Sequence, residues 1–187
     1  MKVKRIGRFK VKVSHPDYEL IKIHTIEAKE IYNYANYIIR QLYFKNSKNH
    51  DYSMEFVHEY PELNKDFEIY LKENNQFTST FYRIIRNFSR IKEHSLNSKM
   101  VHGIVNILKR DWKSYWKLLK LKINGKYDKP ISIPRYKKKY SVVEYNPQTI
   151  SKAKLKNGYV GTALMEEGFK IPKFYKEYSC KSARALW

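Results

Sequence analysis

Residues 98–122, SKMVHGIVNILKRDWKSYWKLLKLK, form the stretch that decides the fold. Apolar side chains recur in it at steps of three and four residues, which is the spacing of one face of an α-helix. We therefore predict a long amphipathic helix whose apolar face the rest of the chain has to cover. That face consists of Val101, Ile104, Val105, Leu108, Trp112, Tyr115 and Leu119.

Lysines occupy a second face of this predicted helix. At about 100° per residue, Lys109, Lys113, Lys117 and Lys120 point in one direction, and Asp111 is the nearest acidic residue. Lysines without carboxylates one turn away repel one another. Two interpretations stay open: this face is the solvated side of the helix, or it contacts phosphates.

The whole chain is basic, with 38 Lys and Arg against 18 Asp and Glu among 187 residues and a net charge of +20. The excess is local, because residues 25–82 carry 6 basic and 9 acidic side chains whereas residues 83–122 carry 11 and 2. So large a charge disfavours a compact state unless a polyanion offsets it. Nucleic acid is the partner that this distribution favours.

The sequence lacks the residue patterns typical of catalytic, metal-binding and nucleotide-binding sites. The single cysteine, Cys180, rules out an internal disulfide or a paired-cysteine zinc site and fits a reducing compartment. We find no glycine-rich phosphate loop, no convergent carboxylates and no nucleophile beside a base. We therefore expect no catalytic residue, no metal ligand and no cofactor in this chain. No apolar run reaches the roughly 18 residues of a membrane span, so we expect a protein that is neither exported nor membrane-spanning, and the lone cysteine favours the cytoplasm.

The remaining elements are predicted from shorter patterns. Residues 6–13 alternate between apolar and cationic, which is typical of a half-buried strand, and His15-Pro16 should end it. Thr25 is a good N-cap for a helix with Glu27 and Glu30 in its first turn. Shorter helices are expected over 62–73 and 80–92. After residue 123 the pattern turns β-like, as in "YSVVEY", and Asn157-Gly158 is typical of a hairpin turn.

The order strand, helices, strands predicts an α+β fold. If the first strand pairs with the late ones, the helical bundle is an insertion into a small β-barrel or sheet. The expected domains are 1–24 for the first part of the barrel, 25–122 for the helical insertion and 123–187 for the remainder of the barrel and a linker.

Basic and aromatic residues alternate in four places: "RNFSR", "RDWKSYW", "PRYKKKY" and "PKFYKEY". Such pairs contact phosphate with the cation and a base or ribose with the ring. Residues 134–140 are the best binding candidate, since three adjacent lysines cannot all be buried. The alternative is an ordinary solvated loop.

The segment SLNSKMVHGIVNILKRDWKSYWKLLKLKINGKYDKPISIPRYKKK resembles a passage in the TnpB (OrfB) family of transposon-encoded RNA-guided nucleases. Residues 28–46, with the pair Tyr32-Asn33, are similar to the first helix of that family, and residues 146–174 resemble its following β region. The resemblance implies a small, OB-like β-barrel as the wedge domain, with an inserted helical bundle as the recognition domain. It also implies a prokaryotic, nucleoid-associated protein that binds a guide RNA and double-stranded target DNA with a short adjacent motif.

The resemblance also implies site residues. Ser98, Lys99 and His102 would lie where the family contacts the target-adjacent motif, although His102 replaces a common glutamine, and 135–139 would meet RNA. The full set of predicted nucleic-acid-binding residues is Lys4, Arg5, Arg8, Lys10, Arg83, Arg86, Arg90, Ser98, Lys99, His102, Lys109, Lys113, Lys117, Arg135, Tyr136, Lys137, Lys138 and Lys139.

The nuclease domain of that family, with three metal-binding carboxylates and a zinc ribbon, has no counterpart up to Trp187. We therefore expect a non-catalytic, nucleic-acid-binding part of an RNA-guided DNA endonuclease, with metal ions bound only in the missing domain. The alternatives are a stand-alone, cleavage-dead DNA- or RNA-binding regulator and one half of a split nuclease.

Overall fold

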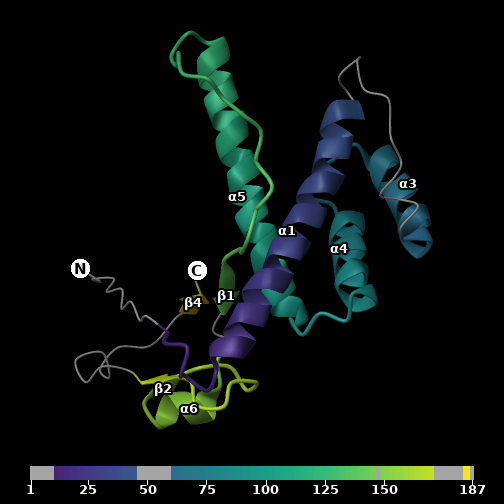
Figure 1. Cartoon of the computed structure of the whole chain (residues 1–187). Helices are drawn as coiled ribbons and strands as arrows, with labels where there is room; N and C mark the ends of the chain where they lie inside the picture. The colour runs from purple at the N-terminus through teal and green to yellow at the C-terminus, as the bar shows by residue number, and fades with distance from the viewer. Residues whose placement is uncertain (1–10, 46–59, 146–147, 171–182, 186–187) are drawn as a thin grey trace.

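The computed structural model describes residues 11–45, 60–145, 148–170 and 183–185, the last as backbone alone. Two long helices dominate it: α1 spans Tyr18–Lys45 and α5 spans Ser98–Ile123. They pack side by side, and the far end of α5 extends beyond the bundle (Figure 1). The α5 bounds confirm the helix predicted over 98–122. Its N-cap is Asn97, whose side-chain oxygen accepts hydrogen bonds from the backbone N–H groups of Lys99 and Met100.

Three shorter elements cover the other side of α1. A 3₁₀ turn η1 over Pro61–Leu63 leads into α3, Asn64–Glu73, and α4 follows at Ser79–Ile91 (Figure 1). The predictions of helices over 62–73 and 80–92 are thereby confirmed in outline. Aromatic and aliphatic side chains from α1, α3, α4 and α5 fill one core, in which the largest fully buried residues include Trp112, Tyr32, Tyr70 and Phe81. This core holds α1, α4 and α5 together and so fixes the faces that they expose.

The start of α1 differs from the prediction. Residues 11–14 form no strand, and α1 begins at Tyr18, seven residues before the expected N-cap. Thr25 is buried inside the helix, where its hydroxyl donates to the carbonyl of Lys22 at 2.8 Å. This bond satisfies the hydroxyl without a helix end. The prediction that Glu27 and Glu30 lie in the first turn was also wrong, because the helix already begins at Tyr18.

Glu27 and Glu30 instead hold the α4–α5 loop against α1. The Glu27 carboxylate accepts from the backbone N–H and the hydroxyl of Ser95 at 3.0 and 2.8 Å. The Glu30 carboxylate lies 3.2 Å from Nε2 of His94. These contacts position the N-terminus of α5 against the middle of α1.

The β elements form no barrel, so the predicted barrel fold was wrong. In the described part of the chain, β1 (Val143–Tyr145) pairs antiparallel with β4 (Ala183–Ala185), and β2 (Tyr159–Val160) pairs antiparallel with β3 (Phe169–Lys170). Two separate two-stranded sheets are too few and too short to close on themselves. The protein is mainly helical, with small β pieces at the N-terminal end of α1.

Asn157 and Gly158 do not form the expected hairpin turn. Asn157 is the C-cap of a short helix α6, Lys152–Lys156, and Gly158 has a φ of 81° that suits glycine at a helix end. The β2–β3 hairpin closes later, through residues 161–168. A Cβ on Gly168 would lie 2.9 Å from the carbonyl oxygen of Val160, so this position requires glycine as well.

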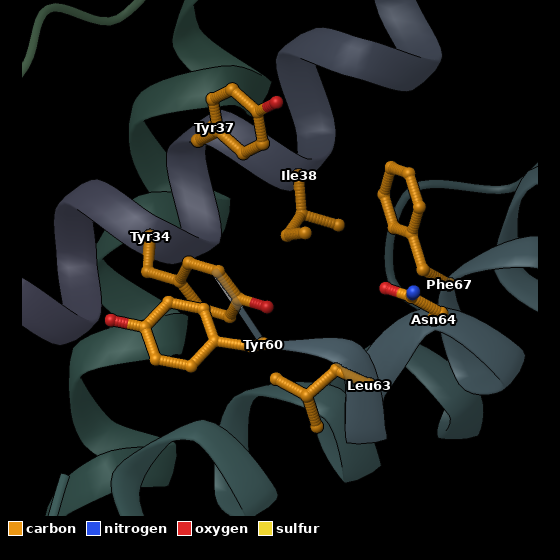
Figure 2. A pocket seen from close by; sticks show the side chains of 7 residues that line it. All are labelled: Tyr34, Tyr37, Ile38, Tyr60, Leu63, Asn64 and Phe67. Atoms are coloured by element: carbon orange, nitrogen blue, oxygen red, sulfur yellow. The ribbon is translucent and has the colours of Figure 1, made fainter. Parts of the chain in front are cut away.

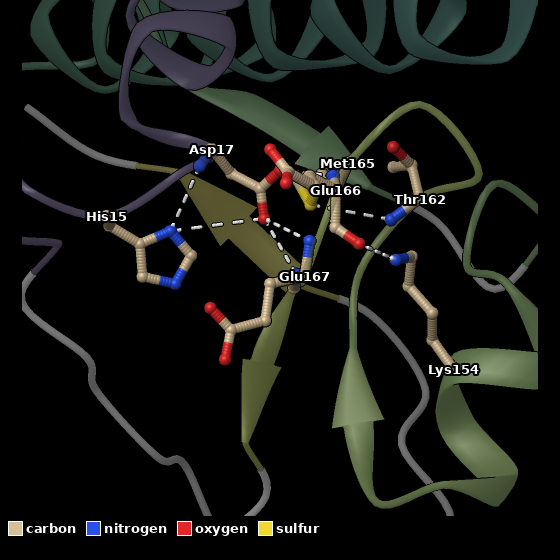
Figure 3. Close-up of polar contacts among 8 residues, drawn as sticks. His15, Asp17, Lys154, Thr162, Met165, Glu166 and Glu167 are labelled. Carbon is tan, nitrogen blue, oxygen red and sulfur yellow. Dashed lines mark hydrogen bonds and ion pairs between the residues drawn. The ribbon is translucent and has the colours of Figure 1, made fainter.

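A buried carboxylate joins this hairpin to the first turn of α1. Asp17 is 2% exposed, and its carboxylate accepts hydrogen bonds from the backbone N–H groups of Glu166, Glu167 and Gly168 (Figure 3). Its own N–H donates to Nδ1 of His15 at 3.1 Å. Because Asp17 already accepts from all three backbone N–H groups, these groups are not available to bind an anion. Their role is to connect the hairpin loop to α1.

Candidate nucleic-acid interface

The predicted residues of α5 lie on one face. At about 100° per residue, Lys99, His102, Lys109, Lys113, Lys117 and Lys120 fall within an arc of about 80° around the helix axis, and all six are exposed. We call this set the α5 basic stripe. Ser98 borders it and is exposed too. At roughly 1.5 Å per residue the stripe is about 32 Å long, so the structure aligns the expected motif-contacting residues with the lysine row.

The stripe has few internal partners. Asp111, the acidic residue within α5, points about 160° away from the centre of the stripe. The Lys109 ammonium lies 5.4 Å from the centre of the Phe77 ring, and the His102 ring meets Tyr82 edge-on at 4.9 Å. Within the described residues, the side chains of Lys113, Lys117 and Lys120 form no ion pair. The charges of these three lysines are therefore not matched by an ion pair within the described residues.

The arginines of α4 differ in whether they form an ion pair. Arg83 forms a two-pronged pair with Asp66 of α3, at 3.0 and 2.8 Å, so its charge is already matched. Arg86 and Arg90 are exposed and form no ion pair with the described residues. The sequence did not reveal this difference, because the Arg83–Asp66 contact joins positions 17 residues apart. Lys4, Arg5, Arg8 and Lys10 lie outside the described residues.

Residues 130–139 run extended along α1 and are fastened to it by hydrogen bonds. The side chain of Asn33 donates to the carbonyl of Lys137 at 2.9 Å and accepts from its N–H at 2.7 Å. The carbonyl of Pro134 accepts from Asn36 at 2.9 Å and from Arg40 at 2.6 Å. The segment is thus a fixed surface, in place of the predicted entry into a barrel strand.

These hydrogen bonds determine which side chains of residues 135–139 are exposed and which turn toward α1 and α5. Arg135, Lys138 and Lys139 are exposed. The Tyr136 ring lies against the Arg40 guanidinium at 4.4 Å. Lys137 turns inward, with its ammonium 3.8 Å from the Asp111 carboxylate and 4.5 Å from the centre of the Tyr32 ring. Three of the five predicted residues therefore present free charge to solvent.

Asn36 connects this surface to the core. It is fully buried, and its side-chain oxygen accepts from the indole N–H of Trp112 at 3.0 Å. Sequence reasoning missed Asn33, Asn36, Arg40 and Asp111 as positioning residues. The available signal was an asparagine on the apolar face of α1, since a buried amide requires partners on both its donor and acceptor sides.

An open groove of about 420 Å³ lies between α1, α5 and residues 130–137. Its lining combines apolar side chains with Asp111, Ser114, Arg135 and Lys137. It lies on the side of α5 away from the basic stripe, so the two predicted binding regions form two separate surfaces. A second cavity, between α1 and η1–α3, has a volume of about 10 Å³ and an aromatic lining, which is room for about one water molecule (Figure 2).

Two kinds of site are not formed by the described residues. No group of three His, Cys, Asp or Glu side chains gathers there to hold a metal ion. None of the described helices combines the length and the apolar character of a membrane span.

Comparison with protein-family models, with curated proteins and with solved structures finds no match.

Proposed function

We propose that this protein binds nucleic acid, with the α5 basic stripe on a phosphate backbone and residues 135–139 on RNA. One observation carries the proposal: the stripe presents exposed cations over about 32 Å without a carboxylate among them. In an ordinary amphipathic helix, acidic residues one turn away would offset them. A polyanion is the partner that supplies the missing charge.

Rigidity supports the same proposal for 135–139. Hydrogen bonds from Asn33, Asn36 and Arg40 fix the backbone there, so Arg135, Lys138 and Lys139 are presented with little further loss of backbone entropy on binding.

The resemblance to TnpB proteins supplies the identity of the ligands in this proposal. RNA at 135–139 would be a guide RNA from the transposon end, and duplex DNA at Ser98, Lys99 and His102 would carry the target-adjacent motif. In this proposal the chain contributes binding to an RNA-guided DNA endonuclease and no catalytic group.

Salt-dependent binding tests the proposal. Fluorescence anisotropy with a labelled RNA and a labelled DNA duplex, at several salt concentrations, should give log affinity against log salt with a slope of about −0.9 per phosphate neutralised on duplex and about −0.7 on a single strand. Replacing Lys113, Lys117 and Lys120 together by glutamine should make the duplex slope shallower by up to about 2.7.

A matched control separates the stripe from net charge. Glutamine at Lys65, Lys72 and Lys152, which are exposed on α3 and α6, removes the same charge from elsewhere. This control should keep most of the salt slope. Equal slopes for the two triple variants would show that the stripe has no special role, and a flat affinity for the unmodified protein would refute nucleic-acid binding itself.

A further inference from the structure

The groove between α1, α5 and 130–137 contains a feature that phosphate binding does not explain. A carboxylate, Asp111, lies in its wall among Arg135 and Lys137, in a protein with a net charge of +20. A carboxylate repels phosphate, so the part of the wall around Asp111 is not built for a nucleic-acid backbone. The inference below rests on the proposed function, and it concerns what a bound RNA places in this groove.

The Asp111 carboxylate is held in one orientation. Oδ2 accepts from the Tyr32 hydroxyl at 2.6 Å and faces the Lys137 ammonium at 3.8 Å. Burial, followed by this hydrogen bond, raises the pKa of Tyr32 well above its usual range, so the hydroxyl remains a donor. No hydrogen bond within the described residues uses Oδ1, and the side chain is 39% exposed. An oriented acceptor is thus left open toward the groove.

The rest of the groove suits a flat, partly apolar group. Ile131, Leu118 and Pro130 contribute apolar lining, and Arg135 supplies a cation. Its volume of about 420 Å³ lies within the range of roughly 300–1,000 Å³ that small-ligand sites occupy. An unpaired nucleotide has the matching parts: a planar base, base-edge N–H donors for the carboxylate and a phosphate for the arginine.

We propose that this groove receives one unpaired guanine of a bound RNA, with Asp111 accepting hydrogen bonds from its Watson–Crick edge and Arg135 contacting its phosphate. Guanine presents two adjacent donors on this edge, N1–H and the exocyclic amine, for the unused Oδ1 and the remaining lone pair of Oδ2. Uracil presents one N–H between two carbonyl oxygens, which a carboxylate repels. The groove would give base preference to a protein whose other contacts are electrostatic.

Binding of short RNAs tests the proposal. The probes are labelled 12-mers: uridine alone, uridine alternating with guanosine, and uridine alternating with inosine, which lacks the exocyclic amine. The guanosine probe should bind about 5- to 150-fold tighter than uridine alone, the range of a good two-pronged base contact. Inosine should lose most of this gain. The comparison uses the unmodified protein, so it does not depend on the folding of a variant.

Two variants assign the preference to Asp111. D111N keeps one oxygen as the acceptor for the Tyr32 hydroxyl, so its amide donor faces the N–H donors of the base, and it should abolish the guanosine preference. E68Q makes the same change in charge at an exposed site on α3 and should preserve the preference.

The outcomes separate the inference from the proposed function. Salt-dependent binding of all three RNAs with equal affinity, or a guanosine preference that D111N retains, would overturn the groove assignment and leave RNA binding standing. A DNA 12-mer bound as tightly as its RNA counterpart, with the same D111N effect, would overturn the RNA part of the assignment. Absence of salt-dependent binding would overturn the proposed function and the groove assignment together.

Discussion

Replacing Asn36 should destabilise the protein even when the lost volume is restored. Its side chain joins three parts of the structure, because it accepts from Trp112 of α5 and donates to Pro134 of the extended segment, all from within α1. In N36L the branched heavy-atom shape of the side chain is kept, but the fully buried Trp112 N–H loses its acceptor. An unsatisfied buried donor costs about 1–3 kcal/mol. The Pro134 carbonyl keeps Arg40 as a donor, so its loss adds less.

The expected loss in unfolding free energy for N36L is therefore about 2–3 kcal/mol, and N36A should lose roughly 1 kcal/mol more because a small cavity adds to it. Urea unfolding followed by circular dichroism measures both. For a chain of this size, about 2–3 kcal/mol corresponds to a fall in Tm of roughly 4–12 °C.

A double-mutant cycle isolates the Asn36–Trp112 bond. W112F removes the N–H, so the N36L/W112F pair should lose less stability than the sum of the single variants, with a coupling of about 0.5–3 kcal/mol. Amide exchange at Lys137 should also accelerate in N36L. The Lys137 N–H donates to Asn33, one turn before Asn36 on α1, so loosening of the segment at Pro134 should weaken this bond too. N36L within about 0.5 kcal/mol of the unmodified protein, a change typical of surface sites, would refute the reasoning.

Two further predictions concern the N-terminal end of α1. D17N turns an amide donor toward backbone N–H groups and should cost about 2–4 kcal/mol, with faster amide exchange at Gly168. D66N, which breaks the exposed pair with Arg83, should cost at most about 1 kcal/mol. Equal losses of unfolding free energy for D17N and D66N would contradict the structural role assigned to Asp17. His24 is fully buried, with Nδ1 3.0 Å from the Tyr145 hydroxyl, and burial lowers the pKa of its imidazole. Its contribution is complete above the unfolded pKa of about 6.5 and is lost below it, by at most about 1.4 kcal/mol per pH unit. H24Q should flatten urea stability between pH 7 and pH 5, whereas H102Q at an exposed site should not; parallel profiles for H24Q and the unmodified protein would contradict this.

Helices with a continuous apolar stripe could be predicted from the sequence, because the spacing of their core residues is a local property. The stripe of 98–122 matches α5 to within one residue, and its lysine face is exposed as helical geometry requires. The basic excess that motivates nucleic-acid binding is likewise a property of composition alone.

Polar residues inside helices misled the prediction, because the residue type alone does not show where its hydrogen-bond partner lies. Thr25 resembles an N-cap until its hydroxyl is seen bonded one turn back, and Glu27 resembles a first-turn residue until it is seen on Ser95. The barrel failed for a related reason. A strand pattern shows that a segment can pair, but β1 pairs with β4 some 40 residues later, and only the packed chain decides which segments meet.

The sequence by itself determined the long amphipathic helix α5 and its basic stripe, since periodicity and charge are carried by neighbouring residues. Tertiary structure alone decided that Asn33 and Asn36 fasten residues 134–137 to α1, and that the groove around Asp111 lies on the opposite side of α5 from the stripe. Those features depend on contacts between positions about 75 to 105 residues apart, which form when burial of the shared core brings the helices together.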